Sequence, residues 1–276
     1  MPSFRRLVEV VTNHRIPLRT RRALLRAEVQ RRLAPRPTYR VPYGATDLFL
    51  EHDGYDVDWE TLKSVVADGI YDVPYRGAVV LDIGAHKGYH AAHALSLGAA
   101  WVISFEPEDA NAALLERSVG SRTRSSQRWE LERVAVGSTA GDAELHVMEG
   151  SWGHALEPPE SWAQHEVGTQ RVRVVPLSGV LARIGSDRPS GARIVVKLNI
   201  EGAECDVVLG TPIEAWHTVD EVIVATHPWA ACSDADLESH LRAAGLEKTP
   251  SGHPRMLRLQ RPAAGQPVAA PFQHQT

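Results

Sequence analysis

Apolar runs and amphipathic segments alternate along the chain from residue 79 onward. The apolar runs are continuous and rich in β-branched residues, as is typical of parallel strands buried on both faces; they lie at 79–83, 101–105, 193–200 and 221–226. The amphipathic segments between them predict helices that end near Leu97, Val119, Leu209 and Gly245. We therefore expect an α/β fold, a doubly wound and mostly parallel sheet with helices on both faces.

Weaker patterns extend this sheet and precede it. Alternating residues predict a third strand at 129–136, residues 143–148 have the pattern of a hairpin arm, and 256–261 is expected to close the sheet. Pro107 is expected to open one helix, and Ser233 with Asp236 has the spacing of a helix-capping pair. Ahead of the regular pattern we expect short β-like pieces around 47–50 and an amphipathic helix near 59–68.

The chain divides into four expected segments. These are a basic helical arm at 1–45, a lead-in segment at 46–78, the sheet domain at 79–261 and a Pro-, Ala- and Gln-rich tail at 262–276, which we expect to be disordered. A helix is predicted at 18–33, with Leu18, Leu25, Val29 and Leu33 on one face. That helix is expected to dock on the body or on a second subunit, giving a homodimer; binding of an anionic surface or a phosphate-bearing substrate is the alternative.

Charge and composition limit the function classes. Residues 1–40 contain eleven arginines against Glu9 and Glu28, so they carry +9, and the rest carries −13 of a total of −4. An acidic main domain argues against nucleic acid as a partner. No apolar run has the length of a membrane span or of a signal-peptide core. The two cysteines imply no disulfide framework and fit a reducing compartment, and arginine outnumbers lysine 26 to 4, so we expect a bacterial, cytoplasmic enzyme.

The loop after the first buried strand, DIGAHKGY, has a spacing that selects among nucleotide-type ligands. A dinucleotide fingerprint requires glycines at 84, 86 and 89, but the chain has His86 and Tyr89 at the last two positions. The missing middle glycine argues against a pyrophosphate and against an NAD-dependent oxidoreductase. The remaining pattern of Asp82, Gly84 and Gly88 suits S-adenosylmethionine, with Gly84 close to the ligand and Asp82 orienting the loop or accepting from an ammonium group.

An acid at the end of the second strand strengthens this interpretation. Glu106 follows Gly88 by 18 residues, where a carboxylate can accept both ribose hydroxyls. The simpler alternative is that the glycines serve a tight turn and that Glu106 caps a helix. Because ligands bind beyond the carboxyl ends of such strands, we expect the cofactor to contact Asp82, Gly84, Ala85, His86, Gly88, Glu106, Pro107, Val136 and Asn199.

Three motifs follow one another along the chain: VVLDIGAHKGYH, AVGSTAGDAEL and VKLNIEGAECDVVLG. Together they resemble the FkbM family of S-adenosylmethionine-dependent methyltransferases, and the likeness covers about 79–245, with a looser similarity in 46–76. His86 replaces the asparagine of the family's glycine loop, and Leu177-Ser178-Gly179 lacks an aspartate that many members have. The resemblance implies a Rossmann-like class I methyltransferase with S-adenosylmethionine as co-substrate. It also implies methylation of a hydroxyl on a sugar or on a secondary metabolite such as an antibiotic.

Two alternatives stay open beside this reading. One is an N-methyltransferase of the same fold. The other is a protein that binds S-adenosylmethionine without turnover, to which the departures at His86, Ser178 and Asn199 point.

Transfer to a hydroxyl needs a group that removes the proton. His227 stands directly after a strand and is the first candidate, although it could equally be a packing or capping histidine. Glu201 follows the preceding strand and is also expected near the reacting atoms. Lys197 lies within that strand, where it either pairs with Glu201 or Glu204 or steers the acceptor. His154, in the long connection 149–166, is the second-choice base if that connection is an acceptor-binding lid rather than a surface insertion.

A metal is the other way to activate a hydroxyl. The strand ends offer Asn199, Glu201 and His227, only one of which is a carboxylate, and Mg²⁺ prefers oxygen ligands. His86, His90 and His93 have no acid or cysteine beside them in the sequence. We therefore expect no metal site.

Overall fold

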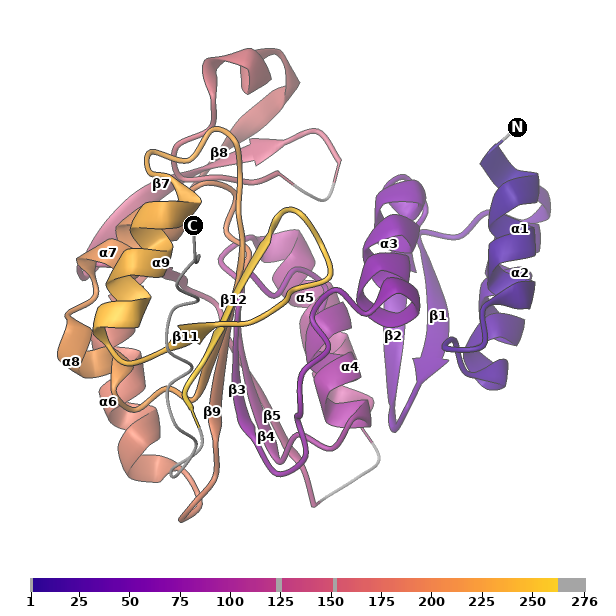
Figure 1. Ribbon diagram of the computed structural model, residues 1–276. Helices are drawn as coiled ribbons and strands as arrows, with labels where there is room; N and C mark the ends of the chain where they lie inside the picture. Colours follow the sequence, from indigo (N-terminus) through magenta and orange to yellow (C-terminus); the bar gives the residue numbers. More distant parts are fainter. Residues whose placement is uncertain (1, 123–125, 151–152, 263–276) are drawn as a thin grey trace, which may run out of the picture.

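A seven-stranded sheet forms the centre of the molecule, and Figure 1 shows its place between the helices. The computed structural model describes residues 2–122, 126–150 and 153–262. The strand order is β11-β12-β10-β9-β3-β4-β5. The parallel strands are β3 (Val79–Ile83), β4 (Trp101–Phe105), β5 (Arg128–Glu132), β9 (Ile194–Leu198) and β10 (Glu221–Ala225). Strand β12 (Met256–Gln260) runs antiparallel between β10 and β11 (Glu247–Lys248). The predicted doubly wound, mostly parallel sheet is confirmed.

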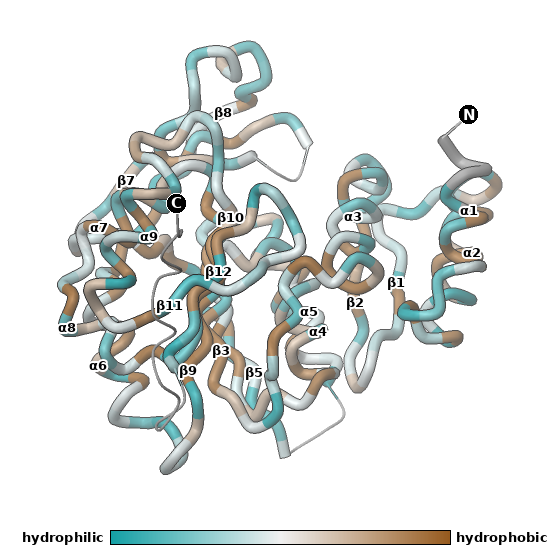
Figure 2. The backbone as a smooth tube through the Cα atoms, in the orientation of Figure 1, coloured by the Kyte–Doolittle hydropathy of each residue, from teal (hydrophilic) through white to brown (hydrophobic). Residues whose placement is uncertain are grey.

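Helices cover both faces of this sheet. On one face lie α4 (Tyr89–Ser96) and α5 (Asp109–Gly120), and on the other α6 (Leu177–Asp187), α7 (Glu204–Gly210), α8 (Ile213–Trp216) and α9 (Asp234–Ala243). All five residues of β3 are buried, and they alternate between the two hydrophobic cores: Val80 packs with the α4 side and Leu81 with the α6 side. Figure 2 shows the apolar residues concentrated along the central strands.

The helix termini follow local capping chemistry. Ser233 and Asp236 form the predicted capping box at the start of α9. Helix α5 begins at Asp109 rather than at Pro107, because the Glu108 carboxylate accepts the backbone N–H groups of Ala110 and Asn111 and so takes the N-cap position.

A second, three-stranded sheet corrects the prediction of one strand at 129–136. The chain leaves the main sheet after β5 and continues as β6 (Ala135–Gly137), which pairs with β8 (Glu166–Pro176); β8 also pairs with β7 (Gly141–Met148), the predicted hairpin arm. Strand β8 was not predicted because it is largely exposed and has no continuous apolar run. The connection between β7 and β8 includes the short 3₁₀-helix η2 (Glu160–His165).

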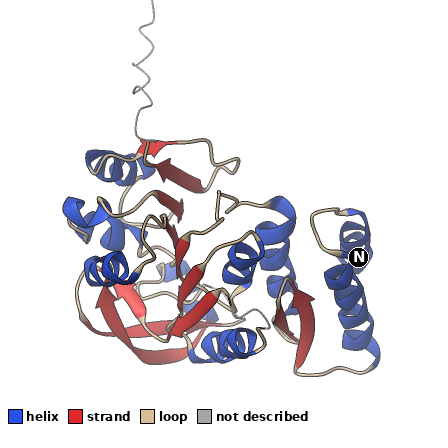
Figure 3. Ribbon diagram, turned by 90° about the horizontal axis from the view of Figure 1, so that it is seen from below, coloured by secondary structure: helices blue, strands red, loops and turns tan. Residues whose placement is uncertain are grey.

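The segment before residue 79 packs against α4 and α5 (Figure 1), and Figure 3 shows its N-terminal helix at one side of the molecule. It consists of α1 (Pro2–Thr12), α2 (Leu18–Leu33), the hairpin β1 (Thr38–Tyr43) and β2 (Thr46–Glu51), α3 (Tyr55–Leu62) and a π-helix, η1 (Lys63–Asp68). The expected boundary at 45/46 falls at the turn of the hairpin. The expected disordered tail lies outside the described residues from 263 onward.

Helix α2 has the predicted bounds but packs through a different face. Leu24 and Ala27 are buried, and the Thr20 hydroxyl donates to the Pro42 carbonyl 2.7 Å away, so that side rests on β1. Leu33, on the predicted apolar face, is 80% exposed. No helix in the described part of the chain is long and apolar enough to span a membrane.

The two cysteines are joined, which corrects the expectation that they stay free. Cys205 lies in α7 and Cys232 in the loop between β10 and α9, and a disulfide links them. The pairing follows from the topology: β9 and β10 are neighbours, so the loops at their carboxyl ends lie side by side. The reducing compartment inferred from free cysteines loses this support.

Candidate functional site

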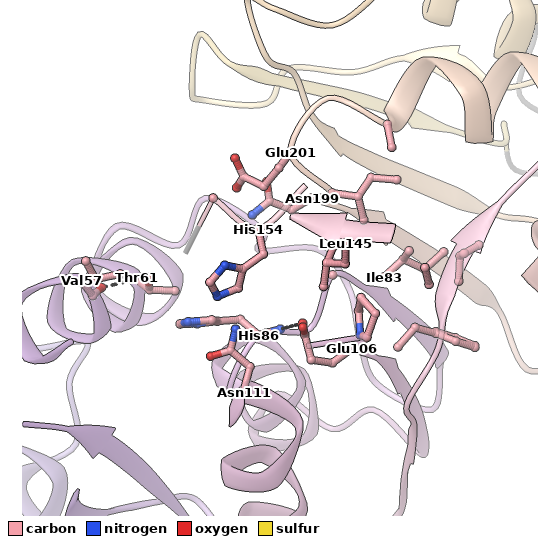
Figure 4. Close-up of a pocket in the computed structure, with 18 of the residues that line it drawn as sticks. Val57, Thr61, Ile83, His86, Glu106, Asn111, Leu145, His154, Asn199 and Glu201 are labelled. Atoms are coloured by element: carbon pink, nitrogen blue, oxygen red, sulfur yellow. Dashed lines mark hydrogen bonds between the residues drawn. The ribbon is translucent and has the colours of Figure 1, made fainter. Parts of the chain in front are cut away.

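A cavity of about 580 Å³ opens where β3, β4 and β9 end (Figure 4). This volume lies within the range of small-molecule binding sites. Its walls come from the loops after these three strands, from the start of the second sheet, from residues 153–156, and from α3 with η1. Of the expected cofactor contacts, the lining includes Gly84, His86, Glu106, Pro107, Val136 and Asn199. Asp82, Ala85 and Gly88 are not part of it.

The two glycines of the first loop are required by the protein's own packing. Gly84 has a φ of +74°, and a Cβ there would lie 1.9 Å from the Asn199 carbonyl oxygen. Gly88 has a φ of +86°, and its Cβ would lie 2.8 Å from the Trp129 ring. Gly84 therefore lets the β3 and β9 loops approach each other, while Gly88 lets the start of α4 pack against β5.

His86 has a left-handed backbone with a φ of +52°. Its N–H donates to Glu106 Oε2 over 2.7 Å, which ties the first loop to the end of β4. Its side chain extends away from Glu106 toward α3 and lies below His154 in Figure 4. A non-glycine residue held in this conformation is typical of functional loops.

The Glu106 carboxylate is buried at the bottom of the cavity. Besides the His86 N–H, it accepts the Glu108 N–H over 3.0 Å. Burial raises the pKa of Glu106 to about 8, although these two backbone donors act to lower it. Two of the roughly four lone-pair positions of the carboxylate are thereby used, and the remaining ones can accept ligand hydroxyls.

A buried ion pair lies beneath the lining. Asp82 and Lys197 face each other in the β3–β9 register, with Asp82 Oδ1 3.1 Å from Lys197 Nζ and 3.1 Å from His90 Nδ1. Burial would raise the pKa of Asp82, but Lys197 and His90 lower it to about 2. Lys197 also donates to the Gly84 carbonyl over 2.6 Å. The expected pairing of Lys197 with Glu201 or Glu204 is wrong, because Lys197 is occupied by Asp82 and by the glycine loop.

Glu201, His227 and Glu204 form a chain of groups at one side of the cavity. Glu201 lines the cavity with a φ of +54°, and its Oε2 lies 3.6 Å from His227 Nε2. His227 Nδ1 lies 3.0 Å from Glu204 Oε1, and Glu204 is held by the N–H groups of Ile200 and Gly202. His227 is not among the lining residues, so it reaches the cavity through Glu201.

Burial and charge act in opposite directions on these groups. Burial raises the pKa of Glu201, with His227 opposing the rise. Burial would lower the pKa of His227, but the adjacent carboxylates of Glu204 and Glu201 raise it above its usual value. The arrangement can hold one proton between a histidine and a carboxylate that faces the cavity.

Sequence reasoning missed Trp229, which packs against this group. Its indole N–H donates to the Glu201 carbonyl over 3.3 Å, and its ring centroid lies 4.8 Å from that of His227 and 4.7 Å from that of Trp162. The disulfide at Cys232 holds the same loop to α7. Tryptophan at 229 carried no motif, so only the fold reveals this contact.

The wall formed by α3 and η1 was also missed. Val57 and Thr61 from α3, Ser64 and Val65 from η1, and Tyr71 line the cavity. The buried Tyr71 ring lies 5.7 Å from Lys197 Nζ, and burial raises the pKa of its hydroxyl. In the sequence, the signal for this wall was the amphipathic pattern near 59–68, which predicts a helix but not its place at the cavity.

Two of the three histidines considered as metal ligands, His90 and His93, bind other side chains. His90 contacts Asp82 and, through Nε2, the Tyr75 hydroxyl at 2.9 Å. His93 hydrogen-bonds Tyr43 and Asp72 over 2.6 and 2.7 Å. Within the described residues, no group of three or more His, Cys, Asp or Glu side chains is placed to hold a metal ion.

The comparisons with known proteins concern the same part of the chain. A family model described as the methyltransferase FkbM domain matches residues 82–247, which are 166 of the 276 residues. The search of curated proteins found no match.

Among solved structures, three likenesses are weak. Magnesium protoporphyrin IX methyltransferase from Synechocystis PCC 6803 shares 12% identity over 94% of this chain and 91% of that chain, with a TM-score of 0.37. A methyltransferase from Agrobacterium tumefaciens shares 10% identity over 77% of this chain and 59% of that chain, with a TM-score of 0.38. A putative RNA methyltransferase from Pyrococcus horikoshii shares 15% identity over 77% of this chain and 85% of that chain, with a TM-score of 0.37. At such TM-scores these structures carry no argument.

Proposed function

We propose that this chain, which belongs to the FkbM methyltransferase family, transfers the methyl group of S-adenosylmethionine to a hydroxyl oxygen of a small molecule. One observation carries the proposal: a single cavity contains two kinds of carboxyl group. Glu106 is buried at its bottom and can accept hydrogen bonds from ribose hydroxyls, and Glu201, connected to His227 and Glu204, lies at its side.

The residues present fit S-adenosylmethionine. Glu106 has acceptor capacity left for two ribose hydroxyls, and the apolar side chains of Val136, Leu145 and Leu156 line the same cavity and suit an adenine ring. When bound, this co-substrate supplies a methyl group on a positively charged sulfur. The contribution required of the protein is therefore mainly the alignment of the acceptor oxygen and the removal of its proton.

Glu201 is the group that we assign to proton removal. It faces the cavity, and its raised pKa makes it a stronger base than an exposed carboxylate. Transfer would form the O–C bond and break the bond between the methyl carbon and the sulfur, with S-adenosylhomocysteine as the leaving group, while the acceptor hydroxyl loses its proton to Glu201. His227 holds the Glu201 carboxylate through its Nε2, and Glu204 orients the imidazole through its Nδ1. In this assignment His227 is a positioning residue and not the base.

The charges around the cavity support a small acceptor without phosphate groups. Among the described lining residues there is no lysine or arginine, whereas Asp56, Glu60, Glu106 and Glu201 contribute carboxylates. A nucleic acid would require cations along its backbone. Sugars and other hydroxylated metabolites that contain no phosphate need no such cations, and they are the acceptor class that we propose.

Two measurements test the proposal. Calorimetry should detect binding of both S-adenosylmethionine and S-adenosylhomocysteine, and failure to bind either would refute it. A panel of sugars and hydroxylated or aminated metabolites is then screened for release of S-adenosylhomocysteine. Methylation of amines alone would identify an N-methyltransferase, and cofactor binding with no turnover would favour a non-catalytic protein.

Variants locate the base. Glu201→Gln should lower kcat at least a hundredfold, as is usual for loss of general-base catalysis, while cofactor affinity stays within about threefold. Glu214→Gln, an exposed acid on α8, is the matched control and should leave kcat unchanged. A Glu201→Gln enzyme with normal kcat would exclude the assigned base.

A further inference from the structure

His154 is the only histidine that the β7–β8 connection contributes to the described lining of the cavity. Its position is fixed from the neighbouring backbone, because Ala155 forms a bridge to His146 of β7 with N–H···O distances of 2.9 and 3.2 Å. Figure 4 shows the imidazole of His154 directed into the cavity and toward His86. The β7–β8 connection thus holds the His154 side chain opposite His86 of the glycine loop.

The hydrogen bond at Nδ1 determines what this imidazole can do. The Met148 N–H donates to His154 Nδ1 over 3.0 Å, so Nδ1 carries no proton. Burial lowers the pKa of His154, which keeps the ring neutral. A neutral ring with an occupied Nδ1 has its proton on Nε2, and it offers a donor and no free lone pair. His154 therefore does not suit the role of base for which the sequence made it the second choice.

A fixed donor at this place requires an acceptor on the ligand. The methionine part of S-adenosylmethionine ends in a carboxylate, and a carboxylate taken into a cavity must be hydrogen-bonded. No lysine or arginine lines the described cavity, so the donors have to be neutral. With the ribose at Glu106, the loop at His86 lies between the ribose site and the His154 ring.

We propose that His154 Nε2–H binds the carboxylate of the cofactor's methionine part, and that the β7–β8 connection thereby recognises the cofactor. This inference rests on the proposed function and adds a subsite to it. The sequence left open whether this connection is an acceptor-binding lid or a surface insertion; on this assignment its contact is with the co-substrate.

Two ligands that differ at the carboxylate test the assignment. S-adenosylhomocysteine contains the amino-acid group, whereas 5′-methylthioadenosine has the same adenosine and sulfur without it. Calorimetry on His154→Ala should show at least tenfold weaker binding of S-adenosylhomocysteine, the effect of losing one hydrogen bond to a charged group. Binding of 5′-methylthioadenosine should stay within about twofold. His154→Gln, which keeps a side-chain N–H at similar reach, should recover most of the loss.

His165→Ala, an exposed histidine of the same connection, is the control and should change neither affinity. An equal loss for both ligands in His154→Ala would indicate a structural role, and no loss would exclude the contact; either result overturns the inference while the proposed function stands. If the unaltered protein binds neither ligand, the proposed function fails as well.

Discussion

The close approach at Gly84 allows a prediction with an internal control. Gly84 and Gly77 have almost the same backbone angle, with φ of +74° and +73°. They differ in their surroundings, since a Cβ at Gly84 would lie 1.9 Å from the Asn199 oxygen, whereas nothing lies within 4 Å of a Cβ at Gly77. Gly77→Ala therefore measures the cost of the left-handed backbone alone, and Gly84→Ala measures that cost plus the close approach.

The magnitude follows from these two contributions. Alanine in the left-handed region costs about 1–2 kcal/mol. At Gly84 the β9 loop would also have to retreat by about 1.5 Å to restore an ordinary contact of 3.4 Å, and such overpacking costs roughly 1–3 kcal/mol more. We expect the free energy of unfolding to fall by about 1–2 kcal/mol in Gly77→Ala and by roughly 2–5 kcal/mol in Gly84→Ala.

Urea denaturation of the two variants and of the unaltered protein gives these values. Calorimetry with S-adenosylhomocysteine provides a second readout, because the displaced loop carries Asn199 and Glu201, both of which line the cavity. Gly84→Ala should weaken this binding at least tenfold, and Gly77→Ala should leave it unchanged. Equal destabilisation by the two substitutions would show that backbone conformation, and not the approach to Asn199, dictates the glycine.

Three further predictions concern charge and covalent links. If the ionised form of Glu106 binds the ribose, its pKa of about 8 makes S-adenosylhomocysteine affinity rise about tenfold between pH 7 and pH 9, and calorimetry on Glu106→Gln should show no such rise. Reducing the disulfide between Cys205 and Cys232, which are 27 residues apart, should lower the free energy of unfolding by about 3–4 kcal/mol, whereas the Cys205→Ser variant should unfold identically with and without reductant. Lys197→Met leaves the carboxylate of Asp82 buried without its cation and should lower the free energy of unfolding, measured by denaturation, by about 3–5 kcal/mol. If the double variant Lys197→Met with Asp82→Asn recovers none of this loss, the broken ion pair is not its cause.

Patterns that depend on neighbours in the sequence predicted much of the fold. The buried strands were found because parallel strands need apolar residues on both faces, and the α9 capping box because its two partners are three residues apart. The break between β5 and β6 was missed because the alternation runs on through 133–134, while the choice of a different sheet depends on the distant strand β8.

In the cavity, too, local sequence patterns predicted some residues, while contacts between distant strands could not be predicted. Gly84 and Glu106 were identified from spacing, and His86 fits its place because histidine, like asparagine, is one of the residues that tolerate a left-handed backbone. Gly88 was identified from the same spacing, and the structure adds a constraint from the protein itself, because a Cβ there would lie 2.8 Å from the Trp129 ring. The partner of Lys197 and the disulfide depend on strand register and strand order, which no local pattern contains.

The wall formed by α3 and η1 precedes residue 82, where the match to the family begins. The groups assigned to the cofactor and to proton removal lie within the matched residues, whereas Val57, Thr61 and Tyr71 lie outside them. The cavity is thus built from two stretches of the chain, one inside the match to the family and one ahead of it. Exchange of residues 46–76 between relatives would therefore replace one wall of the cavity while the groups assigned to the cofactor and to proton removal stay in place.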